Sequence, residues 1–239
     1  MSYFTTLKGS KAVARDTLEV LLEKPDGLSF TAGQHADVSF KDASFDDPRG
    51  NVRLFSFAST PSEEHIRFAT RLTGSPFKKA LAEASSGTEF VVDDPTGNAV
   101  LHEDSSRPAV FLVGGIGITP ARSIIRDAHE RSLPHTISLF YSNRTQEDAA
   151  YHDEWRDLSA QWDRFSYIPT VTKEANPDGE EGFIDEEKLK RHLTDPQEAV
   201  YYIFGPPAMA QAMKELVGEI GVSDLQIRME EFGGYKSNP

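Results

Sequence analysis

The hydrophobic pattern of the 239-residue chain changes near residue 105. Before that point, short runs of the β type are separated by turn residues such as PDG, DDPRG and PTGN; the runs are DTLEVLLEK, HADVSF, VRLFSFAS, HIRFATRL and TEFVVDD. A single helical segment, PFKKALAEAS, interrupts them. Many short strands joined by turns predict an antiparallel barrel or sandwich.

After residue 106, apolar runs alternate with helix-like segments. The strand-like runs are AVFLV, TISLFYS, FSYIPTV, AVYYIF and LQIRMEEF, and the clearest helix is AMAQAMKELVGEI. This alternation predicts an α/β domain with a doubly wound, five-stranded parallel sheet. We therefore expect two domains, residues 1–105 and 106–239, joined through HEDSSRP at 102–108.

Two turns of the second domain place small residues before a helix. In GGIGITP, glycines 114, 115 and 117 are followed by Thr119, a possible cap, and Pro120, which suits a first helical position. In FGPPAM, Gly205 is followed by two prolines. Helix capping alone could explain one such turn, but two at the same edge of a sheet favour a bound nucleotide.

A third turn of this kind lies in the first domain. In RLTGSPFKKAL, Gly74 permits close approach, Ser75 suits an N-cap and Pro76 a first helical position, with Lys78 and Lys79 beside them. A capped surface helix is the alternative interpretation. Anion sites in both domains indicate two cofactors that meet at the domain interface.

Composition removes several classes of function. The net charge of −13 is spread over both halves, which disfavours nucleic acid as a partner. The chain has no cysteine, which excludes an iron–sulfur cluster or thiolate metal site held by it, and no two histidines have the spacing of a helical metal pair. No apolar stretch is long enough for a membrane span, so we expect a cytoplasmic protein without a metal.

Four motifs in this order resemble those of the ferredoxin–NAD(P)⁺ reductase superfamily of flavin-dependent reductases. RLFSFAS resembles R-x-Y-S-x-x-S, TGSPFKKAL the flavin-phosphate helix, GGIGITP the nucleotide glycine turn, and FGPPAM the C-G-P-P-x-M motif. YSNRTQED adds a fifth. The resemblance implies a six-stranded Greek-key β-barrel for flavin, followed by the NAD(P) domain. FAD is the expected flavin, with FMN less expected.

The resemblance also implies roles for individual residues. Arg53 would hold the flavin diphosphate, Phe55 would pack on the isoalloxazine, and Ser56 would lie near its N5 atom. Backbone from Phe68 to Thr70 would meet the pyrimidine edge. The full set implied for cofactor binding is Arg53, Leu54, Phe55, Ser56, Phe68, Ala69, Thr70, Gly74, Ser75, Phe77, Gly114, Gly115, Gly117, Thr119, Pro120, Ser142, Arg144, Phe204, Gly205, Pro206, Met209 and Phe232.

The sequence departs from the family pattern at two positions. Phe55 replaces the family tyrosine, which removes a hydrogen bond to the flavin, and Phe204 replaces the cysteine near the nicotinamide. Phe204 either reshapes that pocket or packs within its strand. Near the C-terminus, Glu231 and Phe232 match an E-x-F ending, so Ser56 and Glu231 are the candidate catalytic residues. Either Phe232 or Tyr235 could cover the flavin.

The choice of nucleotide stays open at this point. Ser142 and Arg144 suit the 2′-phosphate of NADPH, whereas Glu147 and Asp148 could meet the free ribose of NADH. Arg144 favours NADPH.

The resemblance implies hydride transfer from NAD(P)H to bound FAD, and then single electrons to a separate protein such as ferredoxin or flavodoxin. The basic residues Arg67, Arg71, Lys78 and Lys79 could dock this acceptor. One alternative is a flavin reductase or diaphorase acting on free flavin or small acceptors. Others are an electron-transfer subunit of a larger complex and a degenerate binding module.

Overall fold

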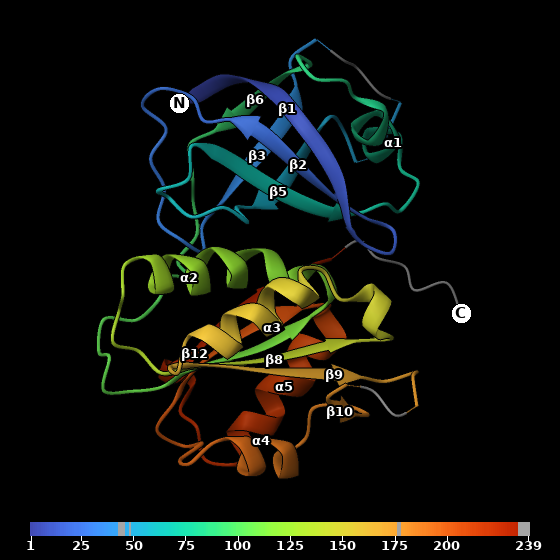
Figure 1. Ribbon diagram of the computed structural model, residues 1–239. Coiled ribbons are helices and arrows are strands. Elements are labelled where there is room, and N and C mark those ends of the chain that lie inside the picture. Colours follow the sequence, from blue (N-terminus) through green and yellow to red (C-terminus); the bar gives the residue numbers. More distant parts are fainter. Residues whose placement is uncertain (43–45, 48, 176–177, 234–239) are drawn as a thin grey trace.

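Two halves of different architecture are stacked in the protein, the barrel above and the parallel sheet below in Figure 1. The computed structural model describes residues 1–42, 46–47, 49–175 and 178–233. The barrel and sheet are joined through residues 94–108, within which we propose the domain boundary at 105–106.

The first half confirms the expected antiparallel barrel. Its six strands follow the order β4-β3-β6-β1-β2-β5, and the outermost strands β4 and β5 contact each other, which closes the sheet. Phe57, Phe68, Phe77 and Phe90 are fully buried inside it. The elements are β1 (Ser2–Ala14), β2 (Thr17–Glu23), β3 (His35–Phe40), β4 (Val52–Ser56), β5 (His65–Arg71), α1 (Pro76–Glu83) and β6 (Glu89–Asp93).

Strand β1 is the barrel strand that the hydrophobic pattern did not reveal. Only Thr5 and Leu7 are buried along its 13 residues, so it carries no apolar run. Its first part pairs with β6 and its second part with β2, from Leu7↔Leu22 to Ala14↔Thr17. Backbone pairing on two sides, which no local pattern reports, therefore defines this strand.

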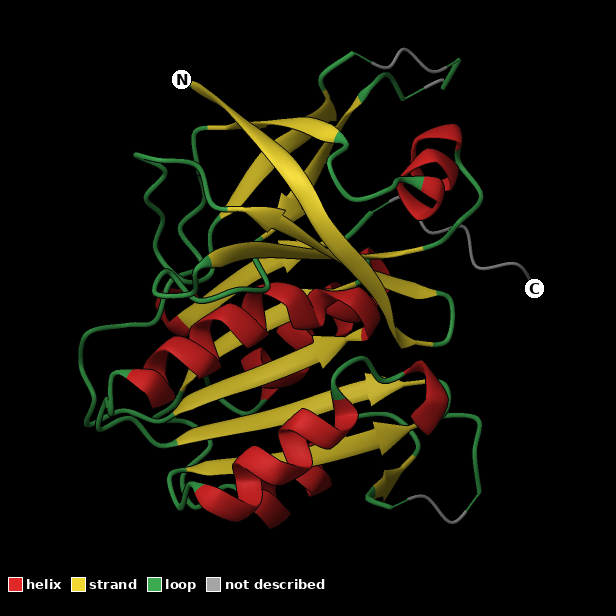
Figure 2. Cartoon of the chain, turned by 45° about the horizontal axis from the view of Figure 1, so that its top comes forward, coloured by secondary structure: helices red, strands yellow, loops and turns green. Residues whose placement is uncertain are grey.

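The second half is a parallel sheet in the order β10-β9-β8-β7-β11-β12. Helices α2 and α3 cover one face and α4 and α5 the other (Figure 2). The expected five strands are present, and the structure adds a two-residue edge strand, β10. The elements are β7 (Ala109–Gly114), α2 (Ile118–Glu130), β8 (Ile137–Asn143), α3 (His152–Gln161), β9 (Phe165–Val171), β10 (Glu180–Glu181), α4 (Glu186–His192), β11 (Val200–Gly205), α5 (Pro207–Glu219) and β12 (Ile227–Glu231).

The apolar runs of the central strands are buried on both faces. In β7, Phe111 and Val113 pack in the core beneath α2 and α3, whereas Val110 and Leu112 pack in the core beneath α4 and α5. A strand covered by helices on both sides needs apolar side chains at every position. Among the described residues, no helix is both long and apolar enough to span a bilayer.

Helix α2 lies between the barrel and the sheet (Figure 1) and fixes one to the other. The Arg122 guanidinium donates to the Ala58 carbonyl and pairs with Glu154 at 3.1 Å, and the Ser123 hydroxyl donates to the Ser59 carbonyl at 2.6 Å. Both side chains are buried. Because the Ser123 hydroxyl and one nitrogen of Arg122 find their acceptors in the barrel, these contacts define how the halves are oriented.

We expect the Arg122→Met variant to lower the free energy of unfolding by about 3 kcal/mol, because it leaves half-buried carboxylates without their cation. Chemical denaturation would measure the change. Arg131→Met is the control, since Arg131 is 62% exposed at the C-terminal end of the same helix and should change stability by less than about 1 kcal/mol. Equal effects for the two variants would contradict the role given to Arg122.

Candidate functional site

A cleft of about 1610 Å³ lies where the carboxyl ends of the parallel strands face the barrel. This is the edge at which doubly wound sheets bind ligands. The cleft exceeds the roughly 300–1,000 Å³ of a usual small-molecule pocket. Residues that contribute from both halves include Arg15, Asp16, Arg71, Leu72, Gly114, Gly115, Ser142, Asn143, Arg144, Thr145, Asp148, Thr172, Lys173, Phe183, Pro206, Met209, Met213 and Phe232.

The glycine turn after β7 forms the floor of this cleft. Gly115 has φ +53°, which favours glycine, and begins a short 3₁₀ turn that leads into α2. A Cβ on Gly117 would lie 2.3 Å from the Phe204 carbonyl oxygen, so the turn can touch β11 only with glycine there. The buried Tyr141 hydroxyl donates to the Gly115 carbonyl at 2.9 Å and holds the turn from the neighbouring strand.

The second small-residue turn meets the first. A Cβ on Gly114 would lie 2.2 Å from the Met209 sulfur, and a Cβ on Gly205 would lie 3.1 Å from the same atom. Pro207 is the first residue of α5, so Pro206 and Met209 stand at the cleft end of that helix. The two motifs, about 90 positions apart in the sequence, therefore form one wall.

Several of the expected nucleotide-site residues lie behind this wall. Helix α2 begins at Ile118, so Pro120 is its third residue and not its first. Thr119 is buried and donates to the Ile116 carbonyl at 3.1 Å instead of capping the helix. The Phe204 ring is fully buried and lies 6.2 Å from the ring of Phe111. Of the two alternatives for Phe204, packing within its strand is therefore the one observed.

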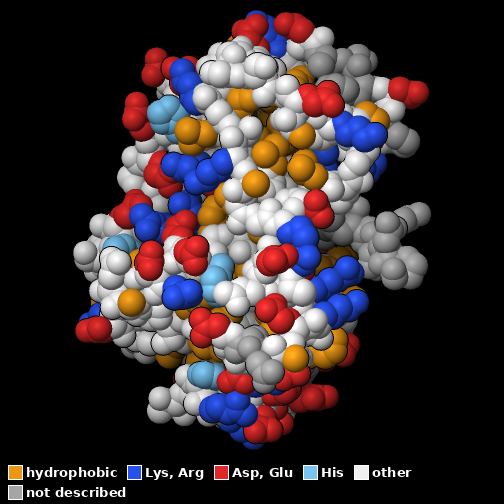
Figure 3. All heavy atoms as spheres, turned by 45° about the vertical axis from the view of Figure 1, so that its right-hand side comes forward, with side chains coloured by type: hydrophobic (Ala, Val, Ile, Leu, Met, Phe, Trp, Pro, Cys, Tyr) orange, Lys and Arg blue, Asp and Glu red, His pale blue; other side chains and the backbone are white. Residues whose placement is uncertain are grey.

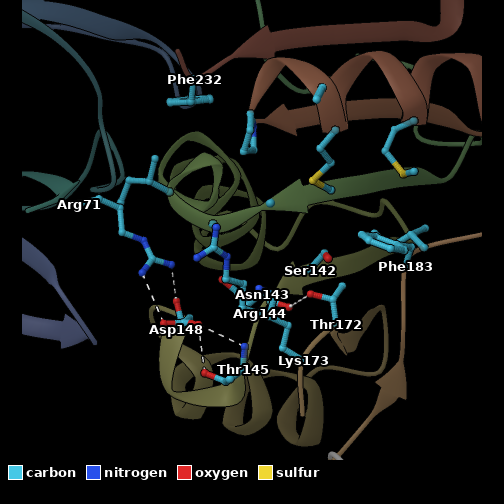
Figure 4. A pocket seen from close by; sticks show the side chains of 18 of the residues that line it. Arg71, Ser142, Asn143, Arg144, Thr145, Asp148, Thr172, Lys173, Phe183 and Phe232 are labelled. Carbon is cyan, nitrogen blue, oxygen red and sulfur yellow. Dashed lines mark hydrogen bonds and ion pairs between the residues drawn. The ribbon is translucent and has the colours of Figure 1, made fainter. Parts of the chain in front are cut away.

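The polar end of the cleft carries two cationic side chains with no ion pair or hydrogen bond in the described part of the chain. These are Arg144 and Lys173, whose backbones are joined by the Lys173 N–H···O=C Arg144 bond of 2.8 Å. Ser142 and Thr172 lie beside them (Figure 4). The second cation, Lys173, follows β9 and was not among the residues chosen from the sequence.

The two nearby acids are already engaged by the barrel. Asp148 accepts from Arg15 Nε at 3.0 Å, and Glu147 pairs with Arg15 at 3.3 Å. Asp148 also lies 3.7 Å from Arg71 Nη1 (Figure 4). Burial raises the pKa of Asp148, but hydrogen bonds from Arg15 and Thr145 and the Arg71 charge outweigh it, so the pKa is lowered. The cleft is thus left with a surplus of positive charge next to Arg144.

On the barrel side, β4, β5 and the start of α1 bring the expected flavin residues together. The Phe55 ring lies 5.8 Å from that of Phe68 and 6.2 Å from that of Phe77, and the Arg53 guanidinium stands 4.9 Å from the Phe77 ring centre. Ser75 caps α1 by accepting from the Lys78 N–H at 3.4 Å.

The remaining residues of this set differ in exposure. Ser56, Ala69 and Thr70 are buried near the domain interface, while Leu54 is 59% exposed on the opposite face of β4 from Arg53. Gly74 has φ +75° with open space beside it, which suits the turn before α1.

A carboxylate occupies the start of α1. Asp47 pairs with Arg53 and accepts from the Phe77 N–H at 3.4 Å and the Arg49 N–H at 3.0 Å. Arg53 Nε is buried without a partner among the described residues. Two backbone N–H groups and the Arg53 guanidinium thus hold the Asp47 carboxylate at the start of α1.

At the C-terminal edge, Phe232 lines the cleft and its N–H donates to the Gly205 carbonyl at 2.9 Å. Glu231 is exposed at the end of β12. Glu230, two positions before Phe232 as the E-x-F spacing requires, instead lies 3.7 Å from His35 across the domain boundary. Tyr235 lies outside the described residues.

The four basic residues proposed for docking do not form one exposed patch. Arg67 pairs with Glu19 and Glu63, Arg71 contacts Asp148, and Lys78 is buried with Nζ 2.7 Å from the Arg71 carbonyl. Only Lys79 of the four is exposed. Internal contacts therefore pair or bury Arg67, Arg71 and Lys78, whose positive charges the docking hypothesis needed at the surface. On the face shown in Figure 3, basic and acidic side chains are interspersed.

Among the described residues, no group of three or more His, Asp or Glu side chains is placed to hold a metal ion.

We expect Gly117→Ala to destabilise the protein by about 1–3 kcal/mol, because the added methyl must push the turn away from β11. Gly218→Ala on α5 is the control, since a Cβ there meets nothing within 4 Å and should be neutral or stabilising. Thermal unfolding of the two variants would separate them. A Gly117 variant as stable as the wild type would show that the contact can relax.

Residues 111–215 match the family model described as the oxidoreductase NAD-binding domain. One component of the Na⁺-translocating NADH-quinone reductase of Neisseria meningitidis is 28% identical over 201 residues, covering 77% of this chain and 49% of that protein. The chain spans about half the length of the curated relatives it matches.

Solved structures share the fold over nearly the whole chain. A ferredoxin NADP⁺ reductase from Neisseria gonorrhoeae with bound FAD and NADP has a TM-score of 0.81 at 23% identity, covering 96% of this chain and 98% of that one. The FAD/NAD-binding domain of a nitric oxide dioxygenase from Vibrio cholerae has a TM-score of 0.83 at 16% identity, covering 97% and 99%. The chain therefore has the two-domain fold of these solved structures, and its residues 111–215 match the oxidoreductase NAD-binding domain.

Proposed function

We propose that this protein is a flavin-dependent NAD(P)H oxidoreductase that passes electrons to a separate acceptor. One observation carries the proposal: the wall formed by the Gly114–Gly117 turn and the Pro206–Met209 turn faces the barrel across a single cleft. A nucleotide held by this wall would have its reactive end at the domain interface, beside Ser56 and Phe232.

The barrel residues fit a flavin. The start of α1 and Arg53 already hold one carboxylate, and the unpartnered Arg53 Nε is a further donor among the described residues. The half-buried Phe55, which packs on the buried Phe68, supplies an apolar surface for a ring system. When bound, flavin would supply the redox chemistry, since it accepts two electrons together and can release them singly.

The chain's own contribution would be binding, orientation and exclusion of water. Tyr141 fixes the Gly115 carbonyl, α2 fixes the barrel to the sheet, and Phe232 covers the cleft from the C-terminal edge. The two catalytic candidates differ in placement: Ser56 is buried at the interface, whereas Glu231 is exposed. We therefore propose that Ser56 meets the reacting edge of the flavin. We also propose Glu230, and not Glu231, as the carboxylate that lies nearer to the domain interface.

FAD is the proposed flavin, and its diphosphate would lie at the start of α1, at the far end of β4 from Ser56. The direct test is to purify the protein, release its chromophore by heat and identify it, and then titrate the holoprotein anaerobically with NADPH and with NADH. A colourless protein that takes up neither FAD nor FMN would refute the proposal.

A specific observation favours a second candidate, an electron-transfer subunit. The curated relatives are named as subunits of an NADH-quinone reductase, and this chain matches half of their length. Such a subunit would elute with partner chains and turn over slowly alone. A protein that reduces ferredoxin or flavodoxin by itself supports the first candidate, and rapid dissociation of flavin after each turnover would indicate a flavin reductase.

We propose NADPH as the preferred nucleotide, because Arg144 and Lys173 have no acidic partner among the described residues of the cleft while Asp148 and Glu147 are paired. Each cation removed from a phosphate costs about 1.5–3 kcal/mol. The Arg144→Ala/Lys173→Ala variant should therefore lose roughly 100-fold or more in kcat/KM for NADPH and little for NADH.

Steady-state kinetics with both nucleotides would measure the ratio. Arg156→Ala on α3, where the side chain is 56% exposed outside the cleft, is the matched control and should leave both values unchanged. A wild-type preference for NADH, or equal losses for the two nucleotides, would contradict the assignment.

A further inference from the structure

The anion site at the start of α1 is filled by the chain itself. The Asp47 side chain is only 2% exposed, and its carboxylate accepts from the Arg53 guanidinium and from two backbone N–H groups, those of Arg49 and Phe77. Phe77 is the second residue of α1, so the carboxylate also meets the positive end of the helix.

The surroundings carry more positive charge than Asp47 neutralises. Arg49, Arg53 and Lys78 all act on this region, and burial together with the two arginine charges lowers the pKa of Lys78 to about 8. The Arg49 N–H lowers the pKa of Asp47 against the effect of burial, and the Phe77 N–H and Arg53 lower it further, so Asp47 is charged at neutral pH. The charges of Arg49 and Arg53 therefore both act on the Asp47 carboxylate, and a ligand with more than one negative charge could engage both arginines.

The Arg53 side chain is 10% exposed and makes several hydrogen bonds within the chain. Besides Asp47, it donates to the carbonyls of Arg49, Gly50 and Val52 at 2.7–3.2 Å, which leaves only Nε without a partner among the described residues. A phosphate can take the Arg53 Nη2 and Phe77 N–H donors only when Asp47 releases them, because two anions cannot share them without strong repulsion.

We propose that Asp47 is an internal competitor for the flavin phosphates, and that a phosphate-bearing flavin binds by exchanging with this carboxylate. The proposal rests on the flavin function proposed above and deepens it by naming the residue that sets flavin affinity. Asp47 stabilises the flavin-free protein and weakens flavin binding by the same contacts. A residue that merely orients Arg53 would instead strengthen flavin binding.

The test compares Asp47→Asn with Asp46→Asn, its exposed neighbour, in the full chain. The probes are FAD and riboflavin, which lacks phosphate, with binding followed by flavin fluorescence. We expect Asp47→Asn to bind FAD about 10-fold more tightly or better, riboflavin affinity to stay unchanged, and the flavin-free variant to unfold at a lower temperature. Asp46→Asn should change none of these. Asp47→Ala is a second route to the same loss of charge, should the amide variant fold poorly.

Weaker FAD binding by both charge-removing variants would overturn the proposal, and so would an equal shift for riboflavin. If the wild type binds FAD and Asp47→Asn binds it no more tightly, the competition between Asp47 and the flavin phosphates is refuted, but the flavin function is not. Wild-type protein that binds neither FAD nor FMN would refute the flavin function itself, so the two failures are distinguishable.

Discussion

The close contact between the glycine turn after β7 and strand β11 is the constraint on which the site depends. Gly117 meets the Phe204 carbonyl, and Gly114 meets the Met209 sulfur, at distances that leave no space for a side chain. Because backbone atoms of Phe204 make the contact with Gly117, the two turns form a wall of nearly fixed shape. The N-termini of α2 and α5 consequently lie at the same edge of the sheet, where their partial positive charges add.

The charged groups between the halves explain why this wall faces the barrel in one orientation. Glu19 of the barrel is buried and accepts from Arg67 and from the Tyr151 hydroxyl of the second domain, while Arg122 reaches in the opposite direction. Buried charges tolerate few arrangements, since each must keep its partners when water is excluded. Asp148 and Glu147 are likewise paired with Arg15 of the barrel, whereas Arg144 and Lys173 have no acidic partner among the described residues of the cleft.

Competition for cations thus recurs in both halves of the molecule. In a chain of net charge −13, many arginines have internal acidic partners, and a phosphate must either find a cation left over or displace a carboxylate. The cleft offers the first situation at Arg144, and the start of α1 offers the second at Arg53. In the proposed function, this difference distinguishes a nucleotide that exchanges readily from a cofactor whose binding reorganises its site.

The sequence by itself determined whatever depends on local patterns. Apolar runs indicated the parallel strands, the glycine and proline turns indicated the edge of the sheet at which the cleft lies, and Ser75 was identified as a cap. Each of these features is decided by residues a few positions apart. Tertiary structure alone decided the rest. Strand β1 exists through pairing on two sides, Phe204 packs inward, Lys173 joins Arg144 from the next strand, and Asp148 pairs with Arg15 from a distant part of the chain. Partners of charged side chains and of exposed strands are chosen by proximity in the folded chain, and no local pattern encodes that proximity.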